Sequence, residues 1–178
     1  IYIGNMMAVS ASRQANLGAL LAEHAGLMGV EGVTVEAADA SGGAALRMAA
    51  LAVRSGAVDA ALAVGVEKYS DVIGPESETF LSQMLDADYE AAQGLTPTSL
   101  AGLLFSRYLV EHSPDRMAFG GFPETAHANG ATNQFAMYQR AMREGTYQKR
   151  AAKEADVLNM FDVAPYADGA AAVLLVRK

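Results

Sequence analysis

A small, nearly uncharged helix between two apolar segments constrains this fold most. The stretch Ser41 to Ser55, SGGAALRMAALAVRS, consists mostly of alanine and other small or apolar residues, and Arg47 and Arg54 are its only charged residues. A helix whose faces are this small and apolar usually packs closely on more than one side. We therefore expect other elements to contact more than one face of this helix.

The segments around this helix predict strands that alternate with helices. Apolar and β-branched runs favour strands, whereas apolar residues spaced three or four apart favour a helix. The predicted elements are a strand at Ile1–Ile3, a helix within 16–30 that ends near Gly26 or Gly29, a strand at 33–38, a buried strand at Ala60–Glu67 and a closing strand at Ala171–Val176. This alternation predicts an α/β layer architecture.

Residues 71–161 interrupt the alternation and form a predicted insertion. The chain becomes rich in acidic residues, glycine and proline up to Pro97, which is typical of a surface excursion. A helix is then expected over Thr98–Ser113, with Thr98 or Ser99 as its N-terminal cap. We therefore predict three parts: 1–70 is the first part of an α/β domain, 71–161 is the insertion, and 162–178 is the closing strand of the α/β domain.

Composition excludes several classes of protein. The net charge of −7 argues against broad nucleic-acid binding, which needs a basic face, and the absence of cysteine excludes disulfides and thiolate metal sites. No apolar run approaches the roughly 20 residues that span a bilayer, and no basic leader precedes a leucine-rich core. We expect a folded cytoplasmic protein that binds neither nucleic acid nor membranes.

Asp39 stands at the break between the strand at 33–38 and the alanine-rich helix. A strand, a sharp turn and a helix in succession place one side chain at a helix N-terminus, where free N–H groups favour an anion. Nucleophiles are commonly mounted in this way. The ordinary alternative is that Asp39 is an N-cap of the helix, and capping aspartates far outnumber catalytic ones.

The stretch VEAADASGGAALRMAALAVRSGAVDAALAVGVEKYSD, Val35 to Asp71, resembles the segment around the nucleophilic cysteine of thiolases. The resemblance is closest to the sterol-carrier-protein-type and archaeal acetyl-CoA acetyltransferases. Three further stretches agree with that family: YIGNM at Tyr2–Met6, HANGATNQFAMY at His127–Tyr138, and DVAPYADGAAAVLLV at Asp162–Val176. The resemblance implies the N-terminal half of a five-layer αβαβα fold, with a mixed sheet covered by helices and a loop-domain insertion.

The resemblance places Asp39 at the position of the nucleophilic cysteine, so it is the expected catalytic residue. Thiolase-type acyltransferases make or cleave carbon–carbon bonds in acyl-CoA. A carboxylate is a weak nucleophile, and its acyl product would be a labile anhydride. We therefore expect turnover of this type to be impaired. Three interpretations stay open: a natural loss of the chemistry, an engineered change, and a re-purposed site. Cysteine-less relatives include aldol-type lyases that act on acyl-CoA esters, which illustrates the third.

The resemblance implies a coenzyme A thioester as substrate and no covalently bound cofactor. The loop domain is where CoA lies in the family, and the insertion carries a basic cluster. His127 falls in a stretch that matches the family's NHxxG region near the acyl pocket, although a structural histidine is the commoner case. The expected substrate-binding residues are His127, Asn129, Arg140, Arg143, Lys149 and Arg150. A charge cluster is, however, usually only a solvated face, and no acidic or histidine spacing indicates a metal site.

The resemblance also implies partners. The chain covers less than half of a family member, without the family's opening strand and helix or the second half that carries the GHP histidine and a second cysteine. We therefore expect these residues alone to lack a complete thiolase site. The expected partners are acyl-CoA and a complementary C-terminal half or another copy of the chain. A small OB-fold acyl-CoA-binding protein is a further option, and a non-catalytic binding or scaffold subunit is the alternative to an enzyme.

Overall fold

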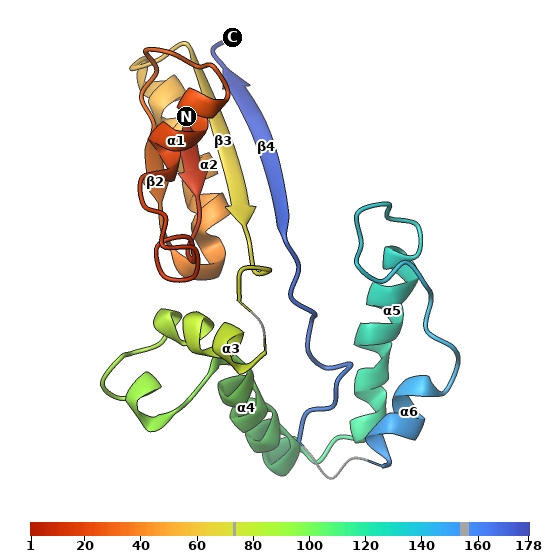
Figure 1. Cartoon of the computed structure of the whole chain (residues 1–178). Helices are drawn as coiled ribbons and strands as arrows, with labels where there is room; N and C mark the ends of the chain where they lie inside the picture. Colours follow the sequence, from red (N-terminus) through yellow and green to blue (C-terminus); the bar gives the residue numbers. More distant parts are fainter. Residues whose placement is uncertain (73, 154–156) are drawn as a thin grey trace. The chain divides into compact units, whose positions relative to one another are not determined.

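The computed structural model describes residues 1–72, 74–153 and 157–178 (Figure 1). The chain forms two compact units. The first unit contains Ile1–Met84 together with Ala167–Lys178, and the second contains Leu85–Tyr166. These bounds are not those of the predicted insertion, and the assignment of 71–161 as a loop domain stays a prediction.

The first unit is built on a four-stranded mixed sheet with the order β2-β1-β3-β4. Strand β1 (Tyr2–Gly4) pairs in parallel with both β2 (Val33–Val35) and β3 (Ala60–Glu67). Strand β4 (Gly169–Val176) runs antiparallel to β3 over its full length, from the Ala60–Val176 pair to the Glu67–Gly169 pair. Figure 1 shows β4 alongside β3. The α/β class and the mixed sheet predicted from the sequence are confirmed.

Two helices pack on this sheet: α1 (Leu17–His24) contacts β1 and β2, and α2 (Ser41–Ser55) contacts all four strands. A Cβ atom added at Gly4 would lie 2.3 Å from the carbonyl oxygen of Ser41, so glycine is what lets the end of β1 approach the start of α2. In β3, Gly65 approaches Gly42 of α2, so the ends of β1 and β3 both lie at the turn that carries Asp39.

One face of α2 forms the core of the first unit. Its buried residues, Ser41, Ala45, Ala49 and Val53, recur every four positions, and Ala49 and Val53 pack against Ala61 and Ala63 of β3. Outside this face, α2 exposes Leu46, Met48 and Leu51 at 40%, 41% and 43%, together with Arg47 and Arg54. Within these residues α2 is therefore covered on one side only, and three of its large apolar side chains are open to solvent.

The predicted helix Ser41–Ser55 and strand Ala60–Glu67 have the predicted bounds. The burial expected for Ala60–Glu67 is wrong in part, because only Ala61 and Ala63 are buried. The first helix ends at His24, before either predicted glycine. Strand β4 begins at Gly169, and Val173, Leu174 and Val176 remain exposed on this edge strand.

The segment before the second unit's long helix contains more regular structure than expected. It forms α3 (Pro75–Leu81) and two short 3-10 turns, η2 (Ser82–Met84) and η3 (Ala91–Gln93). Helix α4 spans Pro97–His112, and the predicted cap at Thr98 or Ser99 is wrong. Thr96 is the cap: its side chain accepts from the Ser99 N–H at 3.2 Å, and the Ser99 hydroxyl accepts from the Thr96 N–H at 2.8 Å.

The second unit continues with η4 (Arg116–Gly120), α5 (Gly121–Gly130) and α6 (Thr146–Ala151). Its centre is Tyr147, whose side chain is fully buried against Gly120. The Tyr147 hydroxyl donates to Asp162 Oδ1 at 2.9 Å, and the Asn159 N–H donates to Asp162 Oδ2 at 2.8 Å. Burial and the hydrogen bond to Asp162 raise the pKa of Tyr147. No helix among the described residues has the length and apolar character that crossing a bilayer requires.

Candidate active site

Asp39 lies on a strained turn between β2 and α2. It is the middle residue of a 3-10 turn, η1 (Ala38–Ala40), and Ala38 has a φ of 48°, a left-handed conformation that is costly for alanine. The Ser41 hydroxyl holds this turn, since it accepts from the Ala37 N–H at 2.9 Å and donates to the Ala38 carbonyl at 2.6 Å. The side chain of Glu36 accepts from the Ala38 N–H at 2.5 Å.

The turn does not use Asp39 as a helix cap. The N-cap position of α2 is Ala40, and no side chain caps the helix there. The interpretation of Asp39 as an N-cap is therefore wrong, because the Ser41 hydroxyl already organises the turn. Asp39 is exposed, and its carboxylate has no hydrogen bond or ion pair within the described part of the chain.

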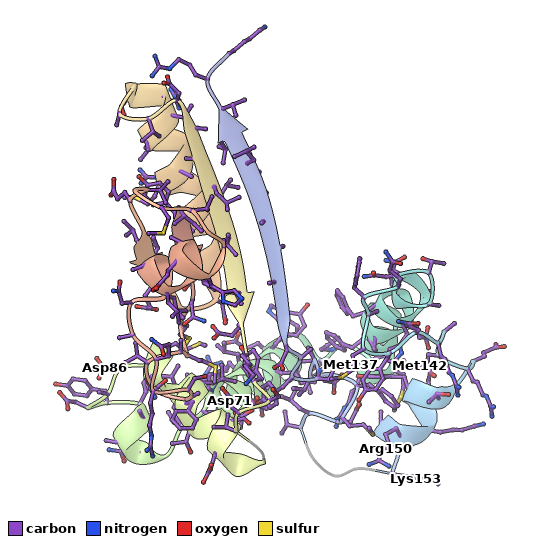
Figure 2. The ribbon with its side chains drawn as sticks, turned by 45° about the horizontal axis from the view of Figure 1, so that its top comes forward. Asp71, Asp86, Met137, Met142, Arg150 and Lys153 are labelled. Atoms are coloured by element: carbon purple, nitrogen blue, oxygen red, sulfur yellow. The ribbon has the colours of Figure 1, made fainter. Side chains whose placement is uncertain are left out.

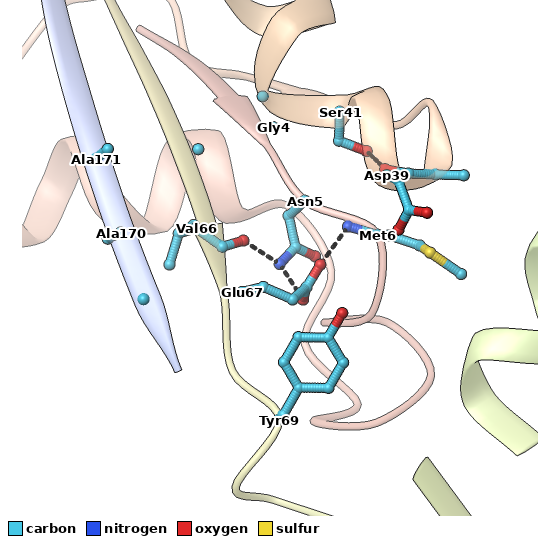
Figure 3. A pocket seen from close by; sticks show the side chains of 14 residues that line it. Gly4, Asn5, Met6, Asp39, Ser41, Val66, Glu67, Tyr69, Ala170 and Ala171 are labelled. Carbon is cyan, nitrogen blue, oxygen red and sulfur yellow. Dashed lines mark hydrogen bonds between the residues drawn. The ribbon is translucent and has the colours of Figure 1, made fainter. Parts of the chain in front are cut away.

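A cavity of about 430 Å³ opens beside Asp39, entirely within the first unit (Figure 3). The ends of β1 and β3, the turn before α2 and the beginning of β4 surround it, as is usual for ligand sites at the carboxyl ends of parallel strands. It is lined by Gly4, Asn5, Met6, Ala38, Asp39, Ser41, Gly42, Gly65, Val66, Glu67, Tyr69, Gly169, Ala170 and Ala171.

Glu67 fixes one wall of the cavity. Its Oε1 accepts from Asn5 Nδ2 at 2.8 Å, its Oε2 accepts from the Met6 N–H at 3.0 Å, and both oxygens lie within 3.4 Å of the Met7 nitrogen. Asn5 is buried and also donates to the Val66 carbonyl at 2.8 Å. The Glu67 carboxylate is therefore committed to the chain that follows β1, which leaves Asp39 as the available carboxylate of this cavity.

Tyr69 forms another part of the lining, and its main chain is anchored. Asp168 Oδ1 accepts from the N–H groups of Tyr69 at 2.7 Å and Ser70 at 2.8 Å. Hydrogen bonds from Ser70 and Tyr69 lower the pKa of Asp168. Partial burial, followed by the negative charges of Glu67 and Asp39, raises the pKa of the Tyr69 phenol. The phenol therefore stays protonated at neutral pH and can donate a hydrogen bond or a proton.

The loop after Tyr69 is held by a separate ion pair. Lys68 pairs with Asp71, and the Ser12 hydroxyl donates to Asp71 Oδ2 at 2.6 Å. The hydrogen bonds from Lys68 and Ser12 lower the pKa of Asp71, and the hydrogen bond to Asp71 raises that of Lys68. These contacts, with those of Asp168, hold both sides of Tyr69 in place.

All of the predicted substrate-binding residues belong to the second unit, so their part in the Asp39 cavity stays a prediction. The His127 ring is half-buried, stacks on Tyr138 with centroids 5.8 Å apart and meets Phe161 edge-on at 6.2 Å. Its Nδ1 lies 3.3 Å from the Arg140 carbonyl oxygen. Near the end of α5, the carbonyl of Asn129 accepts from the Thr132 hydroxyl at 3.1 Å.

The predicted basic residues lie at the surface of the second unit. The side chains of Arg140, Arg143, Lys149 and Arg150 are all solvent-exposed. Figure 2 places Arg150 and Lys153 at the end of α6. Within the described residues no group of histidine, aspartate and glutamate side chains could hold a metal ion.

Sequence reasoning missed Asn5, Glu67 and Tyr69 as cavity residues. Their positions in the sequence could have identified them, because Asn5 directly follows β1, Glu67 ends β3 and Tyr69 comes shortly after β3. The carboxyl ends of neighbouring parallel strands meet at one edge of a sheet, so polar residues there lie together. Asp39 was found because it stands at the break between a predicted strand and the alanine-rich helix, and because the resemblance places it at the position of the family's nucleophile.

Comparison with known proteins assigns the family. The family model for the thiolase N-terminal domain matches residues 1–178. An acetyl-CoA acetyltransferase of Methanothermobacter thermautotrophicus is 36% identical over 175 residues, which cover 98% of this chain and 45% of that protein. The acetyl-CoA acetyltransferase of Methanocaldococcus jannaschii is 34% identical over 177 residues, which cover 98% of this chain and 44% of that protein. The chain thus spans less than half the length of these relatives, and over its whole length it belongs to the thiolase family as a thiolase N-terminal domain.

Proposed function

We propose that these residues form the acyl-CoA-handling half of a thiolase-type enzyme that cleaves or forms a carbon–carbon bond without a covalent acyl-enzyme. The observation that carries the proposal is the position of Asp39, whose exposed carboxylate lines the cavity and has no hydrogen bond or ion pair among the described residues. The relatives named acetyl-CoA acetyltransferases support acyl-CoA as the substrate class.

A carboxylate in this place favours acid–base chemistry over acyl transfer. By resemblance Asp39 occupies the position of the thiolase nucleophile, and a carboxylate there is better suited to removing a proton than to carrying an acyl group. The reaction that such a base starts without an acyl-enzyme is the aldol-type cleavage of a β-hydroxyacyl-CoA into a carbonyl compound and a shorter acyl-CoA. The basic residues Arg140, Arg143, Lys149 and Arg150 are the proposed contacts for the CoA phosphates.

The proposed partner is a complementary C-terminal thiolase half, whether in the same polypeptide or in another. The exposed apolar side chains of α2, Leu46, Met48 and Leu51, support this pairing. The 45% of the relative's length that the chain matches is consistent with it. A scaffold subunit without chemistry of its own would need the same pairing, so activity has to decide between these two functions.

The test uses the full-length polypeptide that carries these residues, with any subunit that co-purifies. We expect cleavage of β-hydroxyacyl-CoA by the parent protein, no acyl adduct in its intact mass, and a loss of cleavage by about 10² to 10⁴ in Asp39→Asn. CoA binding, measured by calorimetry, should persist in that variant. The matched variant Asp39→Cys should gain an acyl adduct on incubation with acetyl-CoA.

Two results would contradict this proposal. An acyl adduct on the parent protein would show covalent acyl transfer instead. CoA binding without any cleavage or exchange reaction would favour the scaffold function.

A further inference from the structure

Tyr69 is the one aromatic side chain that lines the cavity of Asp39 within the described structure. It enters from the chain after β3, whereas Asp39 enters from the turn before α2. In Figure 3 the hydroxyl end of Tyr69 is turned into the cavity, on the side where Asp39 and Met6 lie. A neutral proton donor and a carboxylate therefore share one cavity of about 430 Å³.

We propose that Tyr69 is the proton donor of this site and works with the Asp39 carboxylate as an acid–base pair. The assignment rests on the proposed carbon–carbon cleavage and adds a second catalytic residue to it. The substrate class it fits is a β-hydroxyacyl thioester of coenzyme A, since both a base and an acid are needed to cleave such a compound.

The proton transfers balance without any co-reactant. The Asp39 carboxylate removes the proton of the β-hydroxyl group, the hydroxyl carbon becomes a carbonyl, and the bond between the α and β carbons breaks. Its electron pair passes to the α carbon and forms the enolate of the thioester. The Tyr69 hydroxyl then gives its proton to the α carbon, and the proton held by Asp39 returns to the phenolate, so both residues regain their starting state.

The surroundings divide the two roles between the two residues. The Glu67 oxygens already accept from Asn5, Met6 and Met7, which leaves the Asp39 carboxylate to act as the base. The charges of Glu67 and Asp39, together with burial, keep the Tyr69 phenol protonated, as an acid must be before it acts.

The backbone of Tyr69 is held firmly enough for such a role. Asp168 at the approach to β4 binds the N–H groups of Tyr69 and Ser70, and the Lys68–Asp71 pair flanks the same segment. The residue is thus positioned by β4 as well as by β3. A positioned donor supplies its proton without the reorganisation that a free surface tyrosine would need.

The experiment compares Tyr69→Phe with Tyr89→Phe in the full-length protein. Tyr89 provides the matched control because its side chain is 82% exposed and lies in the second unit, outside the cavity lining. Three quantities are measured: kcat/KM for cleavage of a β-hydroxyacyl-CoA, incorporation of deuterium at the α carbon of the shorter acyl-CoA in D₂O, and the Kd of CoA.

In Tyr69→Phe we expect cleavage and deuterium incorporation to fall together by about 10² or more, whereas the Kd of CoA stays at the parent value. Tyr89→Phe should match the parent protein in all three. The inference is overturned if Tyr69→Phe keeps the parent rates while Asp39→Asn is inactive, or if Tyr69→Phe loses CoA binding as well. A parent protein that neither cleaves nor exchanges would instead overturn the proposed function on which the inference rests.

Discussion

At the scale of single residues, the site depends on a backbone conformation that its own sequence disfavours. Ala38 has a φ of 48°, although glycine would adopt this conformation without the clash that a Cβ creates. The turn is imposed by the Ser41 hydroxyl and the Glu36 carboxylate, which bind the main chain on either side of Ala38. Backbone strain of this kind is common at functional sites, and here it is next to Asp39.

This strain predicts that Ala38→Gly stabilises the protein. Relief of the left-handed alanine outweighs the extra freedom of glycine in the unfolded chain, so the free energy of unfolding should rise by up to about 1 kcal/mol. Ala37→Gly is the matched control: its φ is −158°, so the same substitution there should destabilise by about 0.5 to 1 kcal/mol. Urea unfolding of the full-length protein measures both. A loss of stability in Ala38→Gly would mean that the turn is not strained.

At the scale of secondary-structure elements, β3 and β4 are joined at the site by Asp168. Its carboxylate accepts from Tyr69 and Ser70, which follow β3, just before β4 begins at Gly169. Strand β4 has no other neighbour in the sheet among the described residues. The beginning of β4 lines the cavity. The Asp168 contacts therefore hold this end of β4 in place against the chain that follows β3.

The lowered pKa of Asp168 predicts how this junction responds to acid. The pKa of Asp168 is lower in the folded protein than its ordinary value of 3.8. The ionised carboxylate therefore stabilises the fold fully at pH values above 3.8. This stabilisation is lost as the pH falls through the pKa of the folded protein. Asp168→Asn should therefore lower the thermal midpoint at pH 7, and the difference from the parent protein should shrink as the pH falls below 3.8.

The control for this experiment is Asp88→Asn, which removes the same charge from an exposed side chain of the second unit. The thermal midpoint of Asp88→Asn should differ little from that of the parent protein at every pH. If Asp168→Asn lowers the thermal midpoint by the same amount at neutral and acidic pH, the carboxylate charge does not hold the two strands together.

The elements that sequence reasoning predicted best are those whose limits are local. The α2 bounds follow from its alanine run and the glycine with positive φ at Gly56, and the β3 bounds follow from its continuous apolar residues. The α4 cap was placed wrongly because Thr96, Thr98 and Ser99 are all capable caps, and only the geometry around Pro97 selects Thr96. Tyr69 and Glu67 were missed because their role depends on which strands become neighbours.

At the scale of the whole molecule, the main open question of packing is the side of α2 that no other element in these residues covers. Leu46, Met48 and Leu51 are exposed apolar side chains of the helix that also carries the core residues Ala49 and Val53. The exposed residues Arg47 and Arg54 lie between them. Several large apolar side chains exposed on one helix beside a candidate active-site turn favour an interface. Under the proposed function, the complementary half of the thiolase fold covers this side of α2 and completes the site of Asp39.

This pairing predicts that Leu51→Lys has a large effect in the full-length protein. Leu51 is 43% exposed within these residues, so a lysine on an uncovered surface would change the free energy of unfolding by no more than about 0.5 kcal/mol. If the face is covered, the variant loses a buried apolar side chain and buries a charge, which should cost about 3 kcal/mol or more. Met28→Lys, at an apolar residue that is 81% exposed after α1, is the matched control and should cost about 0.5 kcal/mol or less. Urea unfolding therefore distinguishes the two cases, and a Leu51→Lys protein as stable as Met28→Lys would show that nothing packs on this face of α2.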